Sequence, residues 1–262
     1  MKDHGIGVVR ASGALLTGDA PEARTTPKFI AYVTCGDGDT VRIVEELEEA
    51  GADLIELGIP FSDPIADGPV IQAASQRALQ NGTKTRDVFA IAESIRKKSA
   101  IPLIAFSYLN PVMRYGVENF ARDTASAGVN SLLLTDLPPE SAKEIRAAMH
   151  AQTIGTIFLL APTSTDARIK AVDRASDDFV YYVSTTGVTG ARKELDPTLI
   201  DRLDEVRAKL TKPIAVGFGI SRHEHYELLR GHCDFIVVGS AIVRAVGEGR
   251  SPGSVAREIL QG

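Results

Sequence analysis

Three carboxylates lie within one short stretch of the chain, in different surroundings. Glu56 stands inside the apolar run DLIELG (53–58), whereas Asp63 and Asp67 follow in a loop rich in proline and glycine. Desolvating an ionised carboxylate is costly, so a glutamate in a buried strand needs either a charged partner or a chemical task. Apolar surroundings raise a carboxyl pKa, which suits an acid or base that transfers protons. A more solvated aspartate stays ionised and can bind an N–H group.

Glu56 and Asp67 are therefore candidate catalytic residues of one pocket. They stand eleven positions apart, one near the end of the run and one in the loop beyond it. The alternative for Glu56 is a structural ion pair, because buried ion-pair networks also shift pKa values. For Asp63 and Asp67, the alternative is that they shape turns beside Pro64 and Gly68.

Three glycine-containing segments are candidates for an anion site. GFGIS (217–221) and GSAIV (239–243) follow later apolar runs, the second leads directly into a helical pattern, and GVTG (187–190) stands after another run. Glycine lets backbone N–H groups approach an anion, and a helix N-terminus adds a favourable partial charge. Such glycines can also serve only tight turns. Their places after apolar runs favour a phosphate site.

The elements that would position these groups are eight short runs rich in Ile, Val, Leu and aromatic residues. The runs are FIAYVT (29–34), DLIELG (53–58), PLIAFSY (102–108), NSLLLTD (130–136), TIGTIFLL (153–160), FVYYVS (179–184), PIAVGFG (213–219) and DFIVVGS (234–240). Apolar residues with helical spacing lie between them. Continuous apolar strands that alternate with helices predict parallel strands covered on both faces. Eight units predict a single-domain (β/α)8 TIM barrel, because doubly wound sheets more often have five to seven strands.

The barrel is expected over residues 28–262. Residues 1–27 carry little periodicity and predict a loosely attached N-terminal extension. In a (β/α)8 barrel, functional groups gather at the C-terminal ends of the strands. Glu56, Asp67 and the glycine segments would all lie at that end.

Composition excludes several classes of function. With 44% hydrophobic and 24% charged residues and a net charge of -5, the composition predicts a soluble globular protein and argues against nucleic acid or an anionic membrane as a partner. No apolar stretch reaches the roughly 18 residues of a membrane span. Cys35 and Cys233 are too far apart in sequence to suggest a zinc motif or a disulfide framework, so a reducing cytoplasm is expected.

The segment ELGIPFSDPIADGPVIQ (56–72) resembles the signature of the tryptophan synthase alpha chain family. YLNPV (108–112), TDLP (135–138), GVTG, GFGIS and GSAIV resemble further family motifs in the family's order. The resemblance runs from about Phe29 to the last helix.

This resemblance implies a carbon–carbon lyase that cleaves indole-3-glycerol phosphate to indole and glyceraldehyde 3-phosphate, without a metal or an organic cofactor. Glu56 would correspond to the acid/base that protonates the ring carbon and takes the glycerol hydroxyl proton. Asp67 would bind the indole N–H. The phosphate would be bound by Gly190, Gly219, Gly239 and Ser240. The rest of the substrate pocket would be formed by Phe29, Tyr108, Leu133, Tyr181 and Thr189.

The resemblance also implies a partner, a beta subunit that carries pyridoxal phosphate and consumes the indole in an alpha2beta2 heterotetramer. One alternative is a free-standing indole-3-glycerol phosphate lyase. Another is a catalytically weak scaffold that activates a beta subunit, although the presence of both Glu56 and Asp67 speaks against it. The sequence does not distinguish the synthase subunit from the free-standing lyase, because both share the same chemistry and fold.

Overall fold

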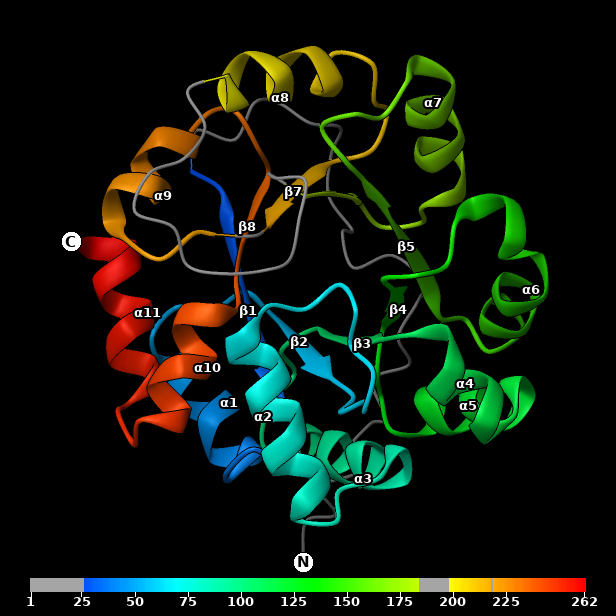
Figure 1. Cartoon of the computed structure of the whole chain (residues 1–262), viewed down its shortest axis with the longest axis vertical. Helices are drawn as coiled ribbons and strands as arrows, with labels where there is room; N and C mark the ends of the chain where they lie inside the picture. Colours follow the sequence, from blue (N-terminus) through cyan, green and yellow to red (C-terminus); the bar gives the residue numbers. More distant parts are fainter. Residues whose placement is uncertain (1–25, 184–197, 218) are drawn as a thin grey trace, which may run out of the picture.

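A closed barrel of eight parallel strands forms the centre of the computed structural model, which describes residues 26–183, 198–217 and 219–262 (Figure 1). The strands are β1 (Lys28–Thr34), β2 (Leu54–Gly58), β3 (Leu103–Ser107), β4 (Ser131–Leu134), β5 (Gly155–Leu160), β6 (Val180–Val183), β7 (Ile214–Gly217) and β8 (Phe235–Val238). One strand coincides with each predicted run, and β1 begins one residue earlier than its run, so the predicted (β/α)8 barrel is confirmed. Residues 1–25 lie outside the described part, and the N-terminal extension stays a prediction.

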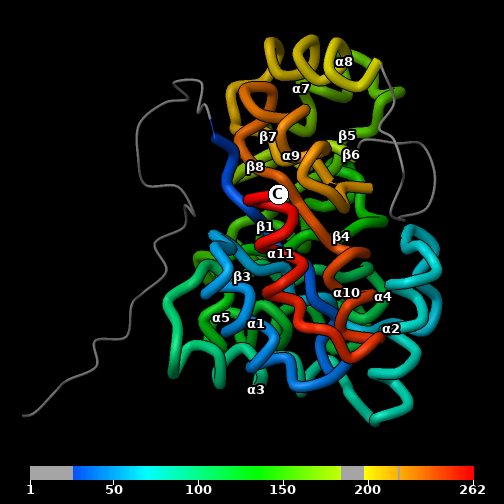
Figure 2. Tube along the Cα trace, turned by 90° about the vertical axis from the view of Figure 1, so that its left-hand side faces the viewer, coloured from blue at the N-terminus to red at the C-terminus, as the bar shows by residue number. Residues whose placement is uncertain are grey.

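Helices surround the barrel on its outer side (Figure 1). They are α1 (Thr40–Glu49), α2 (Pro69–Gln80), α3 (Thr85–Arg96), α4 (Leu109–Tyr115), α5 (Val117–Ser126), the 3-10 helix η1 (Pro139–Ser141), α6 (Lys143–Ala151), α7 (Asp166–Ala175), α8 (Leu199–Arg207), α9 (His223–Leu229), α10 (Ser240–Gly247) and α11 (Pro252–Gln261). Helix α11 packs against α1, α9 and α10, which joins the last unit to the first (Figure 2). Within the described residues, no helix has the length and apolar character to span a membrane.

Both faces of the strands are buried, which explains why the strand runs are apolar throughout. Side chains alternate along a strand with a period of two, so neighbours point to opposite faces. On β1, Ile30 and Tyr32 belong to the cluster inside the barrel, whereas Phe29, Ala31 and Val33 belong to the cluster between strands and helices. The barrel interior is therefore a packed core rather than a channel.

A repeated hydrogen-bond motif joins the N-terminal ends of the strands in pairs. In each pair, an Asp or Asn shortly before an even-numbered strand contacts a residue at the start of the preceding odd-numbered strand. The side-chain oxygen of the Asp or Asn accepts a hydrogen bond from the backbone N–H of that residue, at 2.7 to 2.9 Å. The backbone N–H of the Asp or Asn donates to the carbonyl of the same residue. The four pairs are Asp53 with Phe29, Asn130 with Leu103, Asp177 with Thr156, and Asp234 with Ile214. These contacts hold the end opposite to the site, which leaves the C-terminal loops available for function.

Candidate active site

Strand β2 places Glu56 inside the barrel, next to Tyr32 of β1 and Ile104 of β3. Its side chain is buried, and neither carboxyl oxygen has a hydrogen-bond partner among the described residues. No ion pair to Glu56 occurs in that part of the chain either, which argues against the structural ion pair considered from the sequence. Burial raises the pKa of Glu56 from 4.5 to about 8. Glu56 is therefore protonated at neutral pH and available as an acid.

Asp67 is held in the loop between β2 and α2 by several hydrogen bonds. The phenol of Tyr108 donates to Asp67 Oδ2 at 3.0 Å and accepts from the N–H of Ala66 at 3.0 Å. Asp67 N donates to the carbonyl of Pro64, and Gln72 Nε2 donates to the carbonyl of Asp67 at 2.8 Å. These bonds fix both the backbone and the carboxylate of Asp67.

The environment of Asp67 differs from the solvated one expected from the sequence, because its side chain is buried. Burial raises its pKa to about 6, and the hydrogen bond from Tyr108 opposes this rise. Asp67 thus stays mostly ionised at neutral pH although it is buried. Asp63 is exposed, accepts a hydrogen bond from Ser62 and is not among the described lining residues of the pocket.

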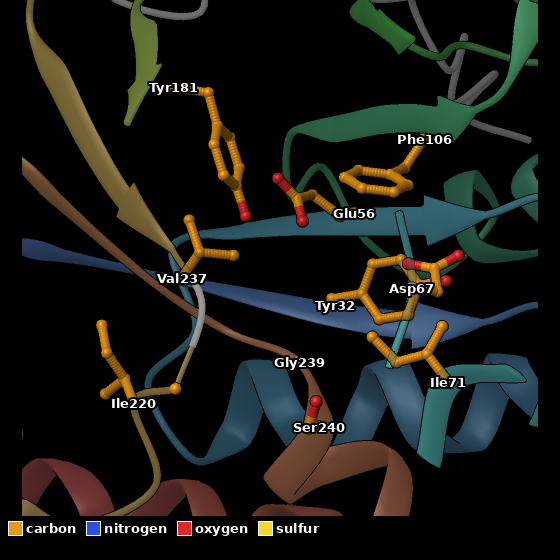
Figure 3. Close-up of a pocket in the computed structure, with 11 residues that line it drawn as sticks. Tyr32, Glu56, Asp67, Ile71, Phe106, Tyr181, Ile220, Val237, Gly239 and Ser240 are labelled. Atoms are coloured by element: carbon orange, nitrogen blue, oxygen red, sulfur yellow. The ribbon is translucent and has the colours of Figure 1, made fainter. Parts of the chain in front are cut away.

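Glu56 and Asp67 line one pocket at the C-terminal end of the barrel (Figure 3). About 400 Å³ of space free of protein atoms lies in and above the pocket, and this volume includes open solvent. Its described lining residues are Tyr32, Glu56, Asp67, Ile71, Phe106, Tyr181, Gly219, Ile220, Val237, Gly239 and Ser240. Two carboxyl groups whose pKa values differ in this way, within a largely apolar pocket, can act as an acid and as a charged partner in one reaction.

The glycine segments supply a second end of the same pocket. Helix α10 begins at Ser240 with Gly239 as its N-cap, and its first turn contains no acidic residue. The first N–H groups of a helix have no partner within the helix, so they can bind an anion. Gly219, after β7, has a φ of +93°, a conformation that favours glycine. The structure thus brings Gly219, Gly239 and Ser240 together with both carboxylates.

One predicted pocket residue is corrected. Phe29 packs between the barrel and the helices, because it occupies an outward position of β1. Tyr32, three residues further along β1, points into the barrel and lines the pocket. Sequence reasoning missed Tyr32, although the two-residue alternation counted along the strand could have found it.

The other predicted pocket residues divide into three groups. Tyr181 lines the pocket, and its contact with the substrate stays a prediction. Leu133 lies inside the barrel, and Tyr108 donates a hydrogen bond to Asp67; neither is among the described lining residues of the pocket. Thr189 and Gly190 lie outside the described residues, so their predicted contacts stay predictions.

The fold and the site together define a class. This is a (β/α)8-barrel enzyme in which two buried carboxyl groups and a helix N-terminus share one pocket at the C-terminal end of the strands.

Comparisons with known proteins identify the family within this class. The sequence profile of the tryptophan synthase alpha chain matches residues 19–260. The tryptophan synthase alpha chain of Solibacter usitatus is 51% identical over 221 residues, which is 83% of each chain. That of Geotalea uraniireducens is 47% identical over 237 residues, 89% of this chain and 88% of the relative. The chain therefore belongs to the tryptophan synthase alpha chain family, which confirms the resemblance found in the sequence.

Solved structures agree with this assignment. A chain of the tryptophan synthase a2b2 complex of Pyrococcus furiosus superposes with a TM-score of 0.83 at 40% identity, covering 90% of this chain and 98% of that chain. A chain of Mycobacterium tuberculosis tryptophan synthase gives a TM-score of 0.82 at 38% identity, with coverage of 90% and 91%.

Proposed function

We propose that this chain cleaves indole-3-glycerol phosphate to indole and glyceraldehyde 3-phosphate, as the alpha subunit of a tryptophan synthase. The observation that carries the proposal is the pairing of Glu56, protonated at neutral pH, with the mostly ionised Asp67 in one pocket. Family membership supports the choice of substrate and of lyase chemistry.

The two carboxyl groups account for every proton in this reaction. Glu56 donates its proton to the ring carbon that bears the glycerol chain, and Asp67 accepts a hydrogen bond from the ring N–H, where positive charge develops. Glu56, now ionised, takes the proton of the adjacent glycerol hydroxyl. The carbon–carbon bond breaks as the aldehyde forms, and its electrons return to the ring. Glu56 ends the cycle protonated, so neither water nor a redox partner is consumed.

The phosphate of the substrate would bind at the other end of the pocket. The N–H groups at the start of α10 and the backbone around Gly219 would hold it without a lysine or arginine. Gly239 and Ser240 begin that helix, and Gly190 and Thr189 are proposed to complete the contacts from the β6–α8 connection. Phosphate binding there would direct the indole ring toward Glu56 and Asp67.

We expect neither a metal nor an organic cofactor in this subunit. In the described residues, no group of three or more His, Cys, Asp or Glu side chains could hold a metal ion. Proton transfer by Glu56 and charge stabilisation by Asp67 suffice for the proposed steps. Pyridoxal phosphate would belong to the beta partner. We also place the enzyme in the cytoplasm, where a reducing environment fits two free cysteines, Cys35 and Cys233.

The proposed partner is a beta subunit, as in the Pyrococcus furiosus a2b2 complex. The loop that carries Asp67 also carries Ile65, whose side chain is 77% exposed. A partner that covers Ile65 would restrict this loop and hold Asp67 in place. We expect a cognate beta subunit to raise the rate of indole formation at least about tenfold, equivalent to about 1.4 kcal/mol of barrier lowering.

Indole release from indole-3-glycerol phosphate by the purified chain, with and without the beta subunit, tests this proposal. A fast isolated chain that no beta subunit accelerates would establish the free-standing lyase instead. Absence of cleavage under both conditions would overturn the proposed reaction, and beta-subunit activation by such an inactive chain would identify the scaffold.

The opposite protonation states of the two carboxyl groups predict a bell-shaped pH profile. Below about pH 6, Asp67 becomes protonated and loses the charge that stabilises the ring nitrogen. Above about pH 8, Glu56 loses the proton that it must donate. We expect kcat/KM, which reports the free enzyme, to fall on both sides of this window. A profile that stays flat from about pH 5 to about pH 9 would contradict the assigned roles.

The substrate phosphate also titrates, with a second pKa near about 6, so the acidic limb requires a control. Inhibition by glycerol 3-phosphate, measured over the same pH range, isolates the titration of the phosphate. The part of the acidic limb that remains after this correction belongs to Asp67.

Removing the Tyr108 hydroxyl is expected to lower catalytic efficiency, because this hydroxyl holds Asp67 in place. Tyr108→Phe deletes the donor to Asp67 and the acceptor for Ala66, and hydrogen bonds to charged groups contribute about 1.5 to 3 kcal/mol. We expect kcat/KM to fall about tenfold and the acidic limb to move to higher pH, because this hydrogen bond lowers the pKa of Asp67.

A matched control is available on the outer side of the barrel. Tyr115 donates to Asp123 at 2.6 Å, away from the pocket, so Tyr115→Phe should leave kcat/KM and the pH profile unchanged. An unshifted acidic limb in Tyr108→Phe would mean that Tyr108 does not act through Asp67.

A further inference from the structure

Gly58, the last residue of β2, lies directly against the phenol of Tyr32. A Cβ atom at position 58 would collide with Tyr32 Oη and Cζ and would come within 2.9 Å of Cε2. Real Cβ atoms do not approach other atoms this closely, so either the phenol or the strand would have to move. Tyr32 pairs with Glu56 across β1 and β2, and Gly58 stands two residues beyond Glu56 on the same face of β2.

The backbone itself does not require glycine at position 58. Gly58 lies in a regular parallel strand and pairs with Thr34, and its φ is outside the positive region where side chains are strained. Alanine would fit the strand conformation. Glycine at position 58 is therefore needed to leave space for the phenol of Tyr32.

Neighbouring side chains restrict the positions that the phenol of Tyr32 can adopt. Its ring packs in a T-shaped arrangement with Phe106, with 5.1 Å between ring centroids and 78° between the ring planes. Beneath it, the interior of the barrel is filled by buried Ile30, Leu54 and Ile104. The open space beside the ring is the ligand pocket, which Tyr32 itself lines (Figure 3).

We propose that Gly58 and Tyr32 form a steric pair that sets the width of the ligand pocket. Gly58 lets the phenol lie across β2, against the wall of the barrel. With any larger residue at this position, the phenol would be displaced into the space between Glu56 and Asp67. Both are positioning residues: Gly58 touches no reacting group, and Tyr32 shapes the space in which the ligand meets the two carboxylates.

Charge makes such a displacement more harmful. Burial and the charge of Asp67, with a smaller contribution from Glu56, raise the pKa of Tyr32 well above its usual range. Tyr32 is paired with Glu56 across the strands and lines the same pocket as Asp67, so a displaced phenol would come between the two carboxyl groups. A displaced phenol would occupy ligand space beside the groups that must contact the ring.

Second-site rescue tests the steric pair, with the proposed cleavage reaction as the assay. Gly58→Ala is expected to lower kcat/KM at least about tenfold, mainly through KM. Tyr32→Leu removes the three atoms that collide with the new Cβ, so the double variant should be at least about threefold more active than Gly58→Ala alone. Tyr32→Phe keeps Cζ and Cε2 and should not rescue. This pattern shows that Gly58→Ala acts through a clash with the Tyr32 ring, and an effect mainly on KM shows that the clash narrows the pocket.

Gly155, at the N-terminal end of β5, supplies a matched control. A Cβ there would collide with Asp178 and would lie 2.9 Å from Ser131, at the opposite end of the barrel. Gly155→Ala should lower the melting temperature and leave KM unchanged, and Tyr32→Leu should not rescue it.

A crystal structure of the Gly58→Ala variant gives a second, independent readout. We expect the Tyr32 phenol to project into the pocket, and a phenol that still lies against the new methyl group would overturn the proposal. If Gly58→Ala does not fold, the double variant with Tyr32→Leu should fold and melt near the single Tyr32→Leu variant. A wild-type chain without cleavage activity would reject the proposed function. If the wild type is active, normal activity of Gly58→Ala, or a failure of Tyr32→Leu to rescue it, would reject only the steric pair.

Discussion

Replacing Glu56 by glutamine is expected to lower kcat by about 10² to 10⁴-fold, the usual contribution of one general acid or base. The amide has nearly the same size as the carboxyl group but cannot give a proton to the ring carbon or take one from the hydroxyl. The substrate would still bind through its phosphate and its ring, so KM should change little.

The same substitution is expected to stabilise the protein. Burial raises the pKa of Glu56 to about 8 in the folded chain, against 4.5 for a solvated glutamate, so the unfolded chain releases this proton at a lower pH than the folded chain. Stability is therefore lost as pH rises from about 4.5 to about 8. At pH 7 this titration lowers the free energy of unfolding by on the order of 3 kcal/mol. Glutamine does not titrate, so the Glu56→Gln variant does not lose this stability.

Single-turnover kinetics, together with denaturant unfolding at about pH 5 and about pH 8, test both parts of this prediction. The stability gain of Glu56→Gln should be larger at the higher pH. Glu248→Gln is a suitable control, because the Glu248 side chain is 52% exposed and pairs with Arg250 at the surface. Near-normal turnover of Glu56→Gln would remove Glu56 from the proton transfers.

Asp67→Asn is expected to lower kcat/KM by about 10² to 10³-fold, comparable to the loss of one preorganised electrostatic group. Asparagine has the same shape, and its amide oxygen can still accept the hydrogen bond from Tyr108. The charge is lost, so positive charge on the ring nitrogen is no longer stabilised. Because this charge develops during the reaction, we expect a larger effect on kcat than on KM.

Asp63→Asn provides the matched comparison for Asp67→Asn, since both residues lie in the same loop. Asp63 is exposed and bonded to Ser62, so its change should leave steady-state kinetics unaltered. Equal effects of the two substitutions would indicate a role for loop structure rather than for the charge of Asp67.

The fold could be predicted because its local signals are strong. Runs such as DLIELG and DFIVVGS are apolar along most of their length because strands and helices bury both faces of the sheet. The sequence did not predict the hydrogen bonds that join Asp53 to Phe29 and Asp234 to Ile214, because they depend on which strand ends meet in the folded barrel. Contacts between distant segments require the three-dimensional arrangement.

The sequence by itself determined the candidate acid Glu56, the loop that carries Asp67 and the glycine segments, because residue type and place along a strand carry that information. Only the tertiary structure decided their environment. Asp67 is buried and held by Tyr108, 41 positions away, and Tyr32 rather than Phe29 faces the ligand pocket. A pKa depends on desolvation and hydrogen bonds, and a pocket on which side chains converge, so both are fixed by neighbours that are distant in the chain.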